Sequence, residues 1–214
     1  MQLRAAEARG KANFGWLDAR HSFSFGHYYD PEWMGHSALR VINQVRVAPG
    51  GGFATHPHAN MEILTCVLQG TIEHKDSLGH AEQIPAGDFQ LMSAGSGIRH
   101  SEYNPSHTEP LSLLQIWIEP NEHGTTPGYQ QKKIENKPGM TLVASPDGEA
   151  GSFRIRQQAR VWRLQLAEGE TLEWALQGRH GYLHMISGEL TGNGLAARPG
   201  DGLLSRDESS WVLT

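Results

Sequence analysis

The sequence has a single cysteine, Cys66, so it cannot form a disulfide within the chain. No apolar run approaches the roughly 20 residues that a membrane-spanning helix needs. The first residues, MQLRAAEARGKANFGW, lack the apolar core of a secretory signal, so we expect a cytoplasmic protein without membrane association. The net charge of −5 comes without long runs of Lys and Arg, which argues against direct binding to nucleic acid.

Sustained helical periodicity is also missing. The 25 glycines and 11 prolines separate short segments rich in β-branched and apolar residues, a pattern typical of β-strands joined by turns. One of these segments, EILTCVLQG, places Cys66 at a buried strand position. A polar stretch at 121–140 interrupts the pattern. We predict an all-β protein with an N-terminal domain at 1–125, a linker at 126–140 and a C-terminal domain at 141–214.

Two stretches of the sequence follow the same outline. Residues 48–71, APGGGFATHPHANMEILTCVLQGT, and residues 167–190, AEGETLEWALQGRHGYLHMISGEL, each contain a glycine-bearing turn followed by apolar strands. A Gly-Asp turn comes later in both halves, at 87–88 and at 200–201. Aligning Gly70 with Gly188 places Trp174 opposite His56 and Leu176 opposite His58, and aligning Gly87 with Gly200 places Leu213 opposite His100. The pattern indicates one fold used twice, with histidines retained in the first copy; chance similarity between glycine-punctuated strands is the alternative.

Histidines at alternate positions mark the first copy. One residue separates His56 from His58, and one separates His100 from Glu102. Side chains alternate between the two faces of a strand, so each pair shares a face. Facing each other inside a small barrel, the pairs supply three imidazoles and one carboxylate, which suit iron, manganese, nickel, copper or zinc. We predict one divalent metal per chain, held by these four residues; histidines without a metal are the alternative.

The motifs GGGFATHPHANMEILTCVLQG and PAGDFQLMSAGSGIRHSEYN resemble the two barrel motifs of cupins in their pirin variant. The stretches GWLDARHSFSFGHYYDPEWMGHSALRVINQ and LLQIWIEP are similar to bacterial pirin-like quercetin 2,3-dioxygenases. The resemblance covers essentially the whole chain and implies a bicupin of two stacked β-barrels, with the metal ligands His56, His58, His100 and Glu102 in the first. The sequence ends at SSWVLT, where the second barrel of that family would need another strand, so an incomplete second barrel is one expectation.

The resemblance also implies a function. Such enzymes cleave the heterocyclic ring of a flavonol such as quercetin with O2 and release carbon monoxide; iron is the first expectation for the metal. Glu102 would then be a ligand and the acceptor of the flavonol hydroxyl proton, because a nearby metal makes that hydroxyl more acidic. A second hypothesis is a redox-sensitive interaction module that binds a regulatory protein without turnover. A third is another cupin reaction, such as isomerisation.

Other polar residues receive supporting roles. Glu62 is expected to hydrogen-bond a ligand, because the carboxylate ligand of pirins lies two residues after the last histidine; direct ligation, as in other cupins, is the alternative. Asn104 is expected to cap its strand. We expect His74 and His80 to be exposed beside a hairpin turn at 75–80.

The remaining histidines and several apolar residues complete the set of candidates. We expect packing roles for His21, His27 and His36, and no metal at His180 or His184. Walls of a substrate pocket would come from the aromatic and apolar residues Phe23, Phe25, Phe53, Met92, Trp117 and Ile118, most of which we expect to pack in the core.

Overall fold

The structure consists of short strands, as the turn-punctuated sequence predicts. A computed structural model describes residues 1–214. The first twelve strands are β1 (Gln2–Arg4), β2 (Gly10–Asn13), β3 (Leu17–His21), β4 (Leu39–Val47), β5 (Gly52–His58), β6 (Glu62–Gln69), β7 (Thr71–Asp76), β8 (Ala81–Pro85), β9 (Asp88–Ser93), β10 (Ile98–Tyr103), β11 (Leu111–Ile118) and β12 (Gly128–Lys133). The others are β13 (Gly139–Ser145), β14 (Phe153–Arg154), β15 (Val161–Gln165), β16 (Leu172–Ala175), β17 (Gly181–His184), β18 (Leu190–Gly192), β19 (Leu195–Ala197), β20 (Gly202–Ser205) and β21 (Ser210–Leu213). The helices are two 3-10 turns, η1 (Ala6–Ala8) and η2 (Glu149–Gly151), and no helix is long and apolar enough to cross a membrane.

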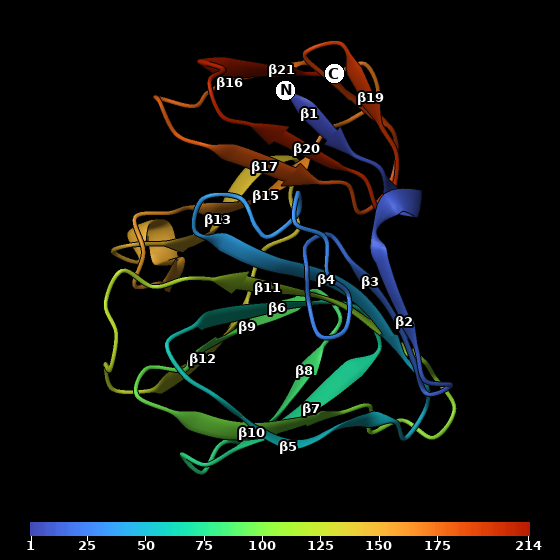
Figure 1. Cartoon of the computed structure of the whole chain (residues 1–214), viewed down its shortest axis with the longest axis vertical. Coiled ribbons are helices and arrows are strands. Elements are labelled where there is room, and N and C mark those ends of the chain that lie inside the picture. The colour runs from blue at the N-terminus through green and yellow to red at the C-terminus, as the bar shows by residue number, and fades with distance from the viewer.

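The first half folds into a barrel of two facing sheets (Figure 1). One sheet has the strand order β12-β9-β6-β11-β4-β3-β2, and the other has the order β5-β10-β7-β8. Ile72 and Ile84 from the smaller sheet pack against apolar side chains of the larger sheet, among them Val67 and Leu113, in one buried cluster. Burial of each such side chain stabilises the fold by roughly 1.5–3 kcal/mol. This cluster holds the two sheets at the spacing that the site requires.

Strand β6 is buried on both of its faces, which explains its continuous apolar sequence. Val67 faces the barrel interior, whereas Leu64 and Cys66 belong to a second cluster that includes Phe153 and Ile155 of the C-terminal half. Cys66 is therefore a core residue, as the sequence predicts, and its burial raises the pKa of the thiol to about 12. The two halves share this apolar layer and stack along the long axis of the molecule (Figure 1).

The second half contains three smaller sheets, ordered β1-β20-β17, β14-β13-β15 and β16-β21-β18-β19. The last of these repeats the strand sequence of the β5-β10-β7-β8 sheet, with each strand number raised by eleven. The same chain path therefore occurs in both halves. Together with the all-β content, this repeat agrees with the prediction of one fold used twice.

Strands cross the expected domain boundaries at both ends of the first half. β12 lies within the expected linker 126–140, yet it pairs with β9 at the edge of the larger sheet. β1 precedes the whole first barrel, yet it pairs with β20 of the second half, with Gln2 opposite Leu204. Figure 1 shows the N-terminal strand among the last strands of the chain. The segment 126–140 is thus partly a strand of the first barrel, because β9 offers an edge that β12 covers.

Candidate metal centre

Three histidines meet on two neighbouring strands. β5 and β10 are antiparallel, with His56 directly opposite His100 and His58 opposite Ile98. Alternation along β5 puts His58 on the same face as His56. The ring centroids lie 4.8 Å apart for His56 and His58, 4.5 Å for His56 and His100, and 5.0 Å for His58 and His100. Each residue can offer a nitrogen within 4.8 Å of the other two.

The hydrogen bonds of these rings leave nitrogens available for a ligand. His56 Nδ1 donates to the carbonyl oxygen of Ala54 at 2.8 Å, so the lone pair of the neutral ring is on Nε2. His100 Nε2 is buried and has no hydrogen-bond partner in the protein. Burial and the neighbouring His56 lower the pKa of His58 to about 4, and burial with the adjacent imidazoles lowers the pKa of His100 further. Both rings are therefore neutral at neutral pH, the form that binds metal ions.

Glu102 lies beside this triad but not inside it. Glu102 forms a set with His74 and His100, whose ligand atoms also lie within 4.8 Å of one another. The strand pairing shifts register between His100 and Glu102. At this bulge a Cβ on Gly52 would lie 2.5 Å from the Glu102 carbonyl oxygen, so a side chain there would force β5 and β10 apart. The structure therefore contains two overlapping sets that share His100.

Two glutamine side chains hold the Glu102 carboxylate. Gln90 Nε2 donates to Glu102 Oε1 at 2.8 Å, and Gln115 Nε2 donates to Glu102 Oε2 at 3.0 Å. Trp117 Nε1 can only donate, and it contacts Gln115 Oε1 at 3.1 Å, which fixes the orientation of that amide. Burial raises the pKa of Glu102 to about 7, although both amide donors oppose the shift. The carboxyl group can thus hold or release a proton near neutral pH.

His74 is a residue whose place the sequence did not reveal. It was expected to be exposed beside the hairpin turn, but it is fully buried and its ring stacks on Tyr129, with the centroids 4.6 Å apart. His80, at the other end of the turn, is partly exposed. Gln90 and Gln115 were likewise missed. The available signal was their alternation with apolar residues on β9 and β11, which predicts an inward-facing side chain but not its partner.

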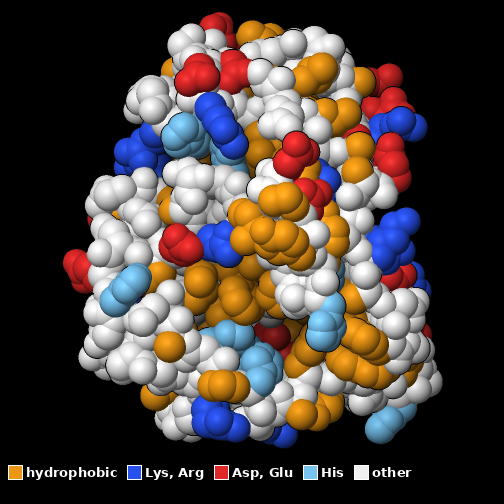
Figure 2. All heavy atoms as spheres, in the orientation of Figure 1, with side chains coloured by type: hydrophobic (Ala, Val, Ile, Leu, Met, Phe, Trp, Pro, Cys, Tyr) orange, Lys and Arg blue, Asp and Glu red, His pale blue; other side chains and the backbone are white.

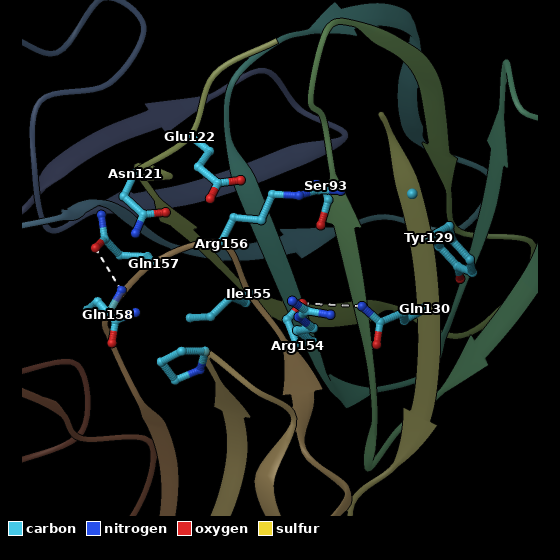
Figure 3. Close-up of a pocket in the computed structure, with 12 residues that line it drawn as sticks. Ser93, Asn121, Glu122, Tyr129, Gln130, Arg154, Ile155, Arg156, Gln157 and Gln158 are labelled. Atoms are coloured by element: carbon cyan, nitrogen blue, oxygen red, sulfur yellow. Dashed lines mark hydrogen bonds between the residues drawn. The ribbon is translucent and has the colours of Figure 1, made fainter. Parts of the chain in front are cut away.

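Glu62 serves the junction between the halves instead of the histidine cluster. Its Oε2 accepts from Ser93 Oγ at 2.7 Å, and Arg156 Nη1 lies 3.7 Å from its Oε1. The expected hydrogen bond from Glu62 to a ligand is therefore absent. Figure 3 shows the adjacent cavity of about 440 Å³, lined by polar residues of both halves, with the Arg156 side chain extended toward Ser93.

Three of the other polar candidates, Asn104, His21 and His36, have hydrogen-bond partners in the fold. Asn104 Nδ2 donates to the carbonyl oxygens of Val47, Ala48 and Glu109, so it fixes the loop after β10. His21 Nδ1 lies 2.7 Å from Asn43 Oδ1, and His36 Nε2 donates to the carbonyl oxygen of Ser205. His27 was expected to pack but is exposed, His180 is also exposed, and His184 packs beside Tyr182.

The aromatic candidates divide between the site and the core. The Trp117 ring contacts His58 at 4.9 Å and Phe25 at 5.3 Å, both edge to face, and Phe53 lies 6.5 Å from His56. Figure 2 shows histidine and acidic side chains in a hollow bordered by hydrophobic side chains, over the first half. Three candidates are instead buried in core clusters: Phe23, Met92 and Ile118.

Comparisons with known proteins agree with this architecture. Residues 2–118 match the family described as Pirin, and residues 142–214 match the quercetinase C-terminal cupin domain. The chain is 52% identical to the quercetin 2,3-dioxygenase of Escherichia coli K12 over 97% of its own length and 90% of that protein. It is 37% identical to the pirin-like protein YhaK of E. coli K12, over 98% and 92% of the two chains. The crystal structure of the bacterial pirin YhhW of E. coli in complex with nickel(II) has a TM-score of 0.96 at 51% identity, covering 99% of this chain and 92% of that one. On the strength of two barrels, a histidine triad and these matches, the chain belongs to the pirin family.

Proposed function

We propose that this protein is a metal-dependent dioxygenase that cleaves the heterocyclic ring of a flavonol such as quercetin with O2 and releases carbon monoxide. The observation that carries the proposal is the cluster of His56, His58 and His100 beside the buried carboxylate of Glu102. The relative named quercetin 2,3-dioxygenase, 52% identical over nearly the whole chain, supports the same reaction. The reaction balances, since one flavonol and one O2 give one depside and one carbon monoxide.

The donor types of the triad and Glu102 support our proposal of a single divalent transition metal, with His100 as the residue common to the triad and to the set that contains Glu102. Neutral imidazoles and a carboxylate are ligands for iron, manganese, nickel, copper and zinc, and the unpartnered His100 Nε2 is the nitrogen expected to face the ion. When bound, such an ion would act as a Lewis acid that makes a coordinating hydroxyl group more acidic. Iron is the first metal that we propose for this chain. The relative YhhW has been crystallised with nickel(II), so nickel is tested beside it.

Glu102 is the residue that we propose accepts the proton of the flavonol hydroxyl. Burial raises the pKa of Glu102 in the metal-free protein to about 7, and a general base is most effective when its pKa lies near the working pH. Gln90 and Gln115 hold both of its oxygens, so the carboxylate keeps one orientation while the proton moves. Trp117 and Phe25 form an aromatic wall beside His58, which suits a flat aromatic substrate.

The experiment that tests the proposal starts from metal-free protein. Separate anaerobic samples are reconstituted with Fe(II), Mn(II), Ni(II), Cu(II) and Zn(II), and the bound metal is counted by elemental analysis. Quercetin and O2 are then added, and the loss of flavonol absorbance is compared with the carbon monoxide released. We expect one ion per chain and equal amounts of flavonol consumed and carbon monoxide formed. The same treatment of the His58→Ala variant is the control; absence of turnover with every metal would contradict the proposal.

A further inference from the structure

A line of buried hydrogen-bonding groups runs away from the triad along β7 and β10. His74 Nδ1 lies 3.4 Å from His100 Nδ1, and His74 Nε2 lies 3.0 Å from Asp76 Oδ2. The strand pairing sets this order, because Asp76 is opposite His100 and His74 is opposite Glu102. The side chains of His74 and Asp76 are both 0% exposed. Water therefore cannot substitute for any partner in the line.

The direction of each hydrogen bond follows from Asp76. Its Oδ1 accepts the backbone N–H groups of Leu78 at 2.9 Å and His80 at 3.1 Å, which anchors the carboxylate in the hairpin turn. A carboxylate offers only acceptors, so His74 Nε2 must carry the hydrogen and donate to Oδ2. A neutral His74 then has its lone pair on Nδ1, facing His100. The remaining hydrogen bond requires that His100 Nδ1 donates.

We propose that Asp76 and His74 are positioning residues that hold His100 in the tautomer with hydrogen on Nδ1 and the lone pair on Nε2. The alternative tautomer would place two lone pairs against each other between His74 and His100 and would block Nε2 with a hydrogen. Partners that fix the tautomer of a metal-binding histidine commonly change metal affinity by about 10–100-fold. This inference rests on His100 being a ligand, as proposed above, and extends the site by two residues.

The surroundings keep this line in place. The Tyr129 ring covers His74 at 4.6 Å and His80 at 4.9 Å between centroids. His80 Nδ1 contacts both oxygens of Asp76, at 3.1 and 2.9 Å. The second half offers an internal contrast. Its sheet pairs Leu213 with Gly192, where the first sheet pairs Glu102 with His74. The half that has apolar residues in place of the triad also has no counterpart of His74.

The variant Asp76→Asn tests the inference because it should reverse the donor and acceptor roles along the hydrogen bonds from Asp76 through His74 to His100. The two backbone N–H groups at Oδ1 still need an acceptor, so the amide oxygen stays there and the NH2 group takes the position of Oδ2. It then donates to His74 Nε2, the hydrogen of His74 moves to Nδ1, and His100 is driven to the tautomer with hydrogen on Nε2. We expect a fall in metal affinity of about 10–100-fold, measured by competition with a chelator. Nitrogen-15 NMR of the metal-free protein should show the hydrogen of His100 on Nδ1 in the wild type and on Nε2 in the variant.

Matched variants separate this role from a structural one. Glu73→Gln makes the same charge change on β7, but Glu73 is partly exposed and pairs with the exposed Lys75. The metal affinity of this variant should equal that of the wild type. Asp76→Asn made in a His74→Phe background should cause no further loss, because the connection to His100 is gone. Equal losses in both backgrounds, or a wild-type His100 with hydrogen on Nε2, would overturn the inference. Should His74→Phe fail to fold, the NMR spectra of the wild type and Asp76→Asn decide alone. None of these measurements uses a flavonol. An enzyme that has the expected tautomer but shows no turnover would therefore contradict the proposed function and leave this inference standing.

Discussion

The two halves of the molecule contain sheets of the same strand order, but the paired strands of one carry histidines and those of the other carry apolar residues. In the first half the pair β5 and β10 brings His56 opposite His100, whereas in the second half the equivalent pair β16 and β21 brings Trp174 opposite Trp211. Trp211 packs with Leu176 and Leu213 in an apolar cluster. One backbone arrangement can therefore hold either a polar site or a core. The difference is that each imidazole needs a buried partner, while apolar side chains satisfy one another.

This strand pairing also corrects one alignment made from the sequence. The Gly-Asp turns place Leu213 opposite His100, but the pairing gives that position to Trp211 and aligns Leu213 with Glu102. The error is two residues. Because side chains alternate with a period of two, both residues point to the same face of the strand. The conclusion that the second half offers apolar residues at the metal-binding positions is unchanged.

Within the first half, the largest effect on turnover is expected from removing the charge of Glu102. Glu102→Gln keeps the shape and one oxygen but loses nearly all basicity, so turnover should fall by about 10²–10⁴-fold, the range for a lost general base. Glu62→Gln is the matched control, since Glu62 is equally buried but contacts Ser93 and Arg156. Steady-state rates of the reconstituted enzymes measure both effects. Loss of turnover in Glu62→Gln with a near-normal Glu102→Gln would mean that the proton acceptor has been misassigned.

The next largest effect is expected for His58→Ala, which removes one imidazole from the triad. Water replaces the ring with weaker donation, so metal affinity should fall by more than the roughly 100-fold upper range for a lost orienting partner. The apolar cluster between the sheets does not involve His58, so the barrel should remain folded. Elemental analysis and far-ultraviolet circular dichroism measure the two quantities. Full metal occupancy in this variant would remove His58 from the site.

The apolar half should respond in the opposite way. Leu176→Ala removes a buried side chain from the cluster with Trp211 and should lower the free energy of unfolding by roughly 2–5 kcal/mol. Metal affinity should not change, because Leu176 lies in the second half and the triad lies in the first. Urea denaturation and chelator competition give both values. A variant that is stable but has lost metal would contradict the separation of roles between the halves.

The smallest effect is a dependence of stability on pH in the metal-free protein. Burial raises the pKa of Glu102 from 4.5 to about 7 in the folded state. A raised carboxyl pKa means that the stabilising contribution is present at low pH and is lost as the pH rises through about 7. Relative to Glu102→Gln, the free energy of unfolding of the wild type should fall by on the order of 3 kcal/mol over this rise in pH, at about 1.4 kcal/mol per pKa unit. Urea titrations of both proteins across this range measure the difference; parallel curves would show that Glu102 titrates normally.

The parts that the sequence predicts are those fixed by local spacing. The HxH and HxE pairs indicate their faces because strand geometry alone decides that residues i and i+2 agree. His74 escaped prediction for a different reason, since its burial depends on β12 bringing Tyr129 across the barrel. Gln90 and Gln115 meet Glu102 only through the pairing of distant strands. Partners set by tertiary register have no signature within their own segments.

The pairing of β1 with β20 of the second half affects the order in which the chain can fold. Gln2 to Arg4 pair with residues 202–204, so β1 is synthesised long before the strand with which it pairs. Closing a loop of this length costs entropy before any contact offsets it, and such non-local pairing slows folding. All strands of the barrel with the histidines are synthesised before β20. We therefore expect the β1–β20 pairing to be among the last contacts to form.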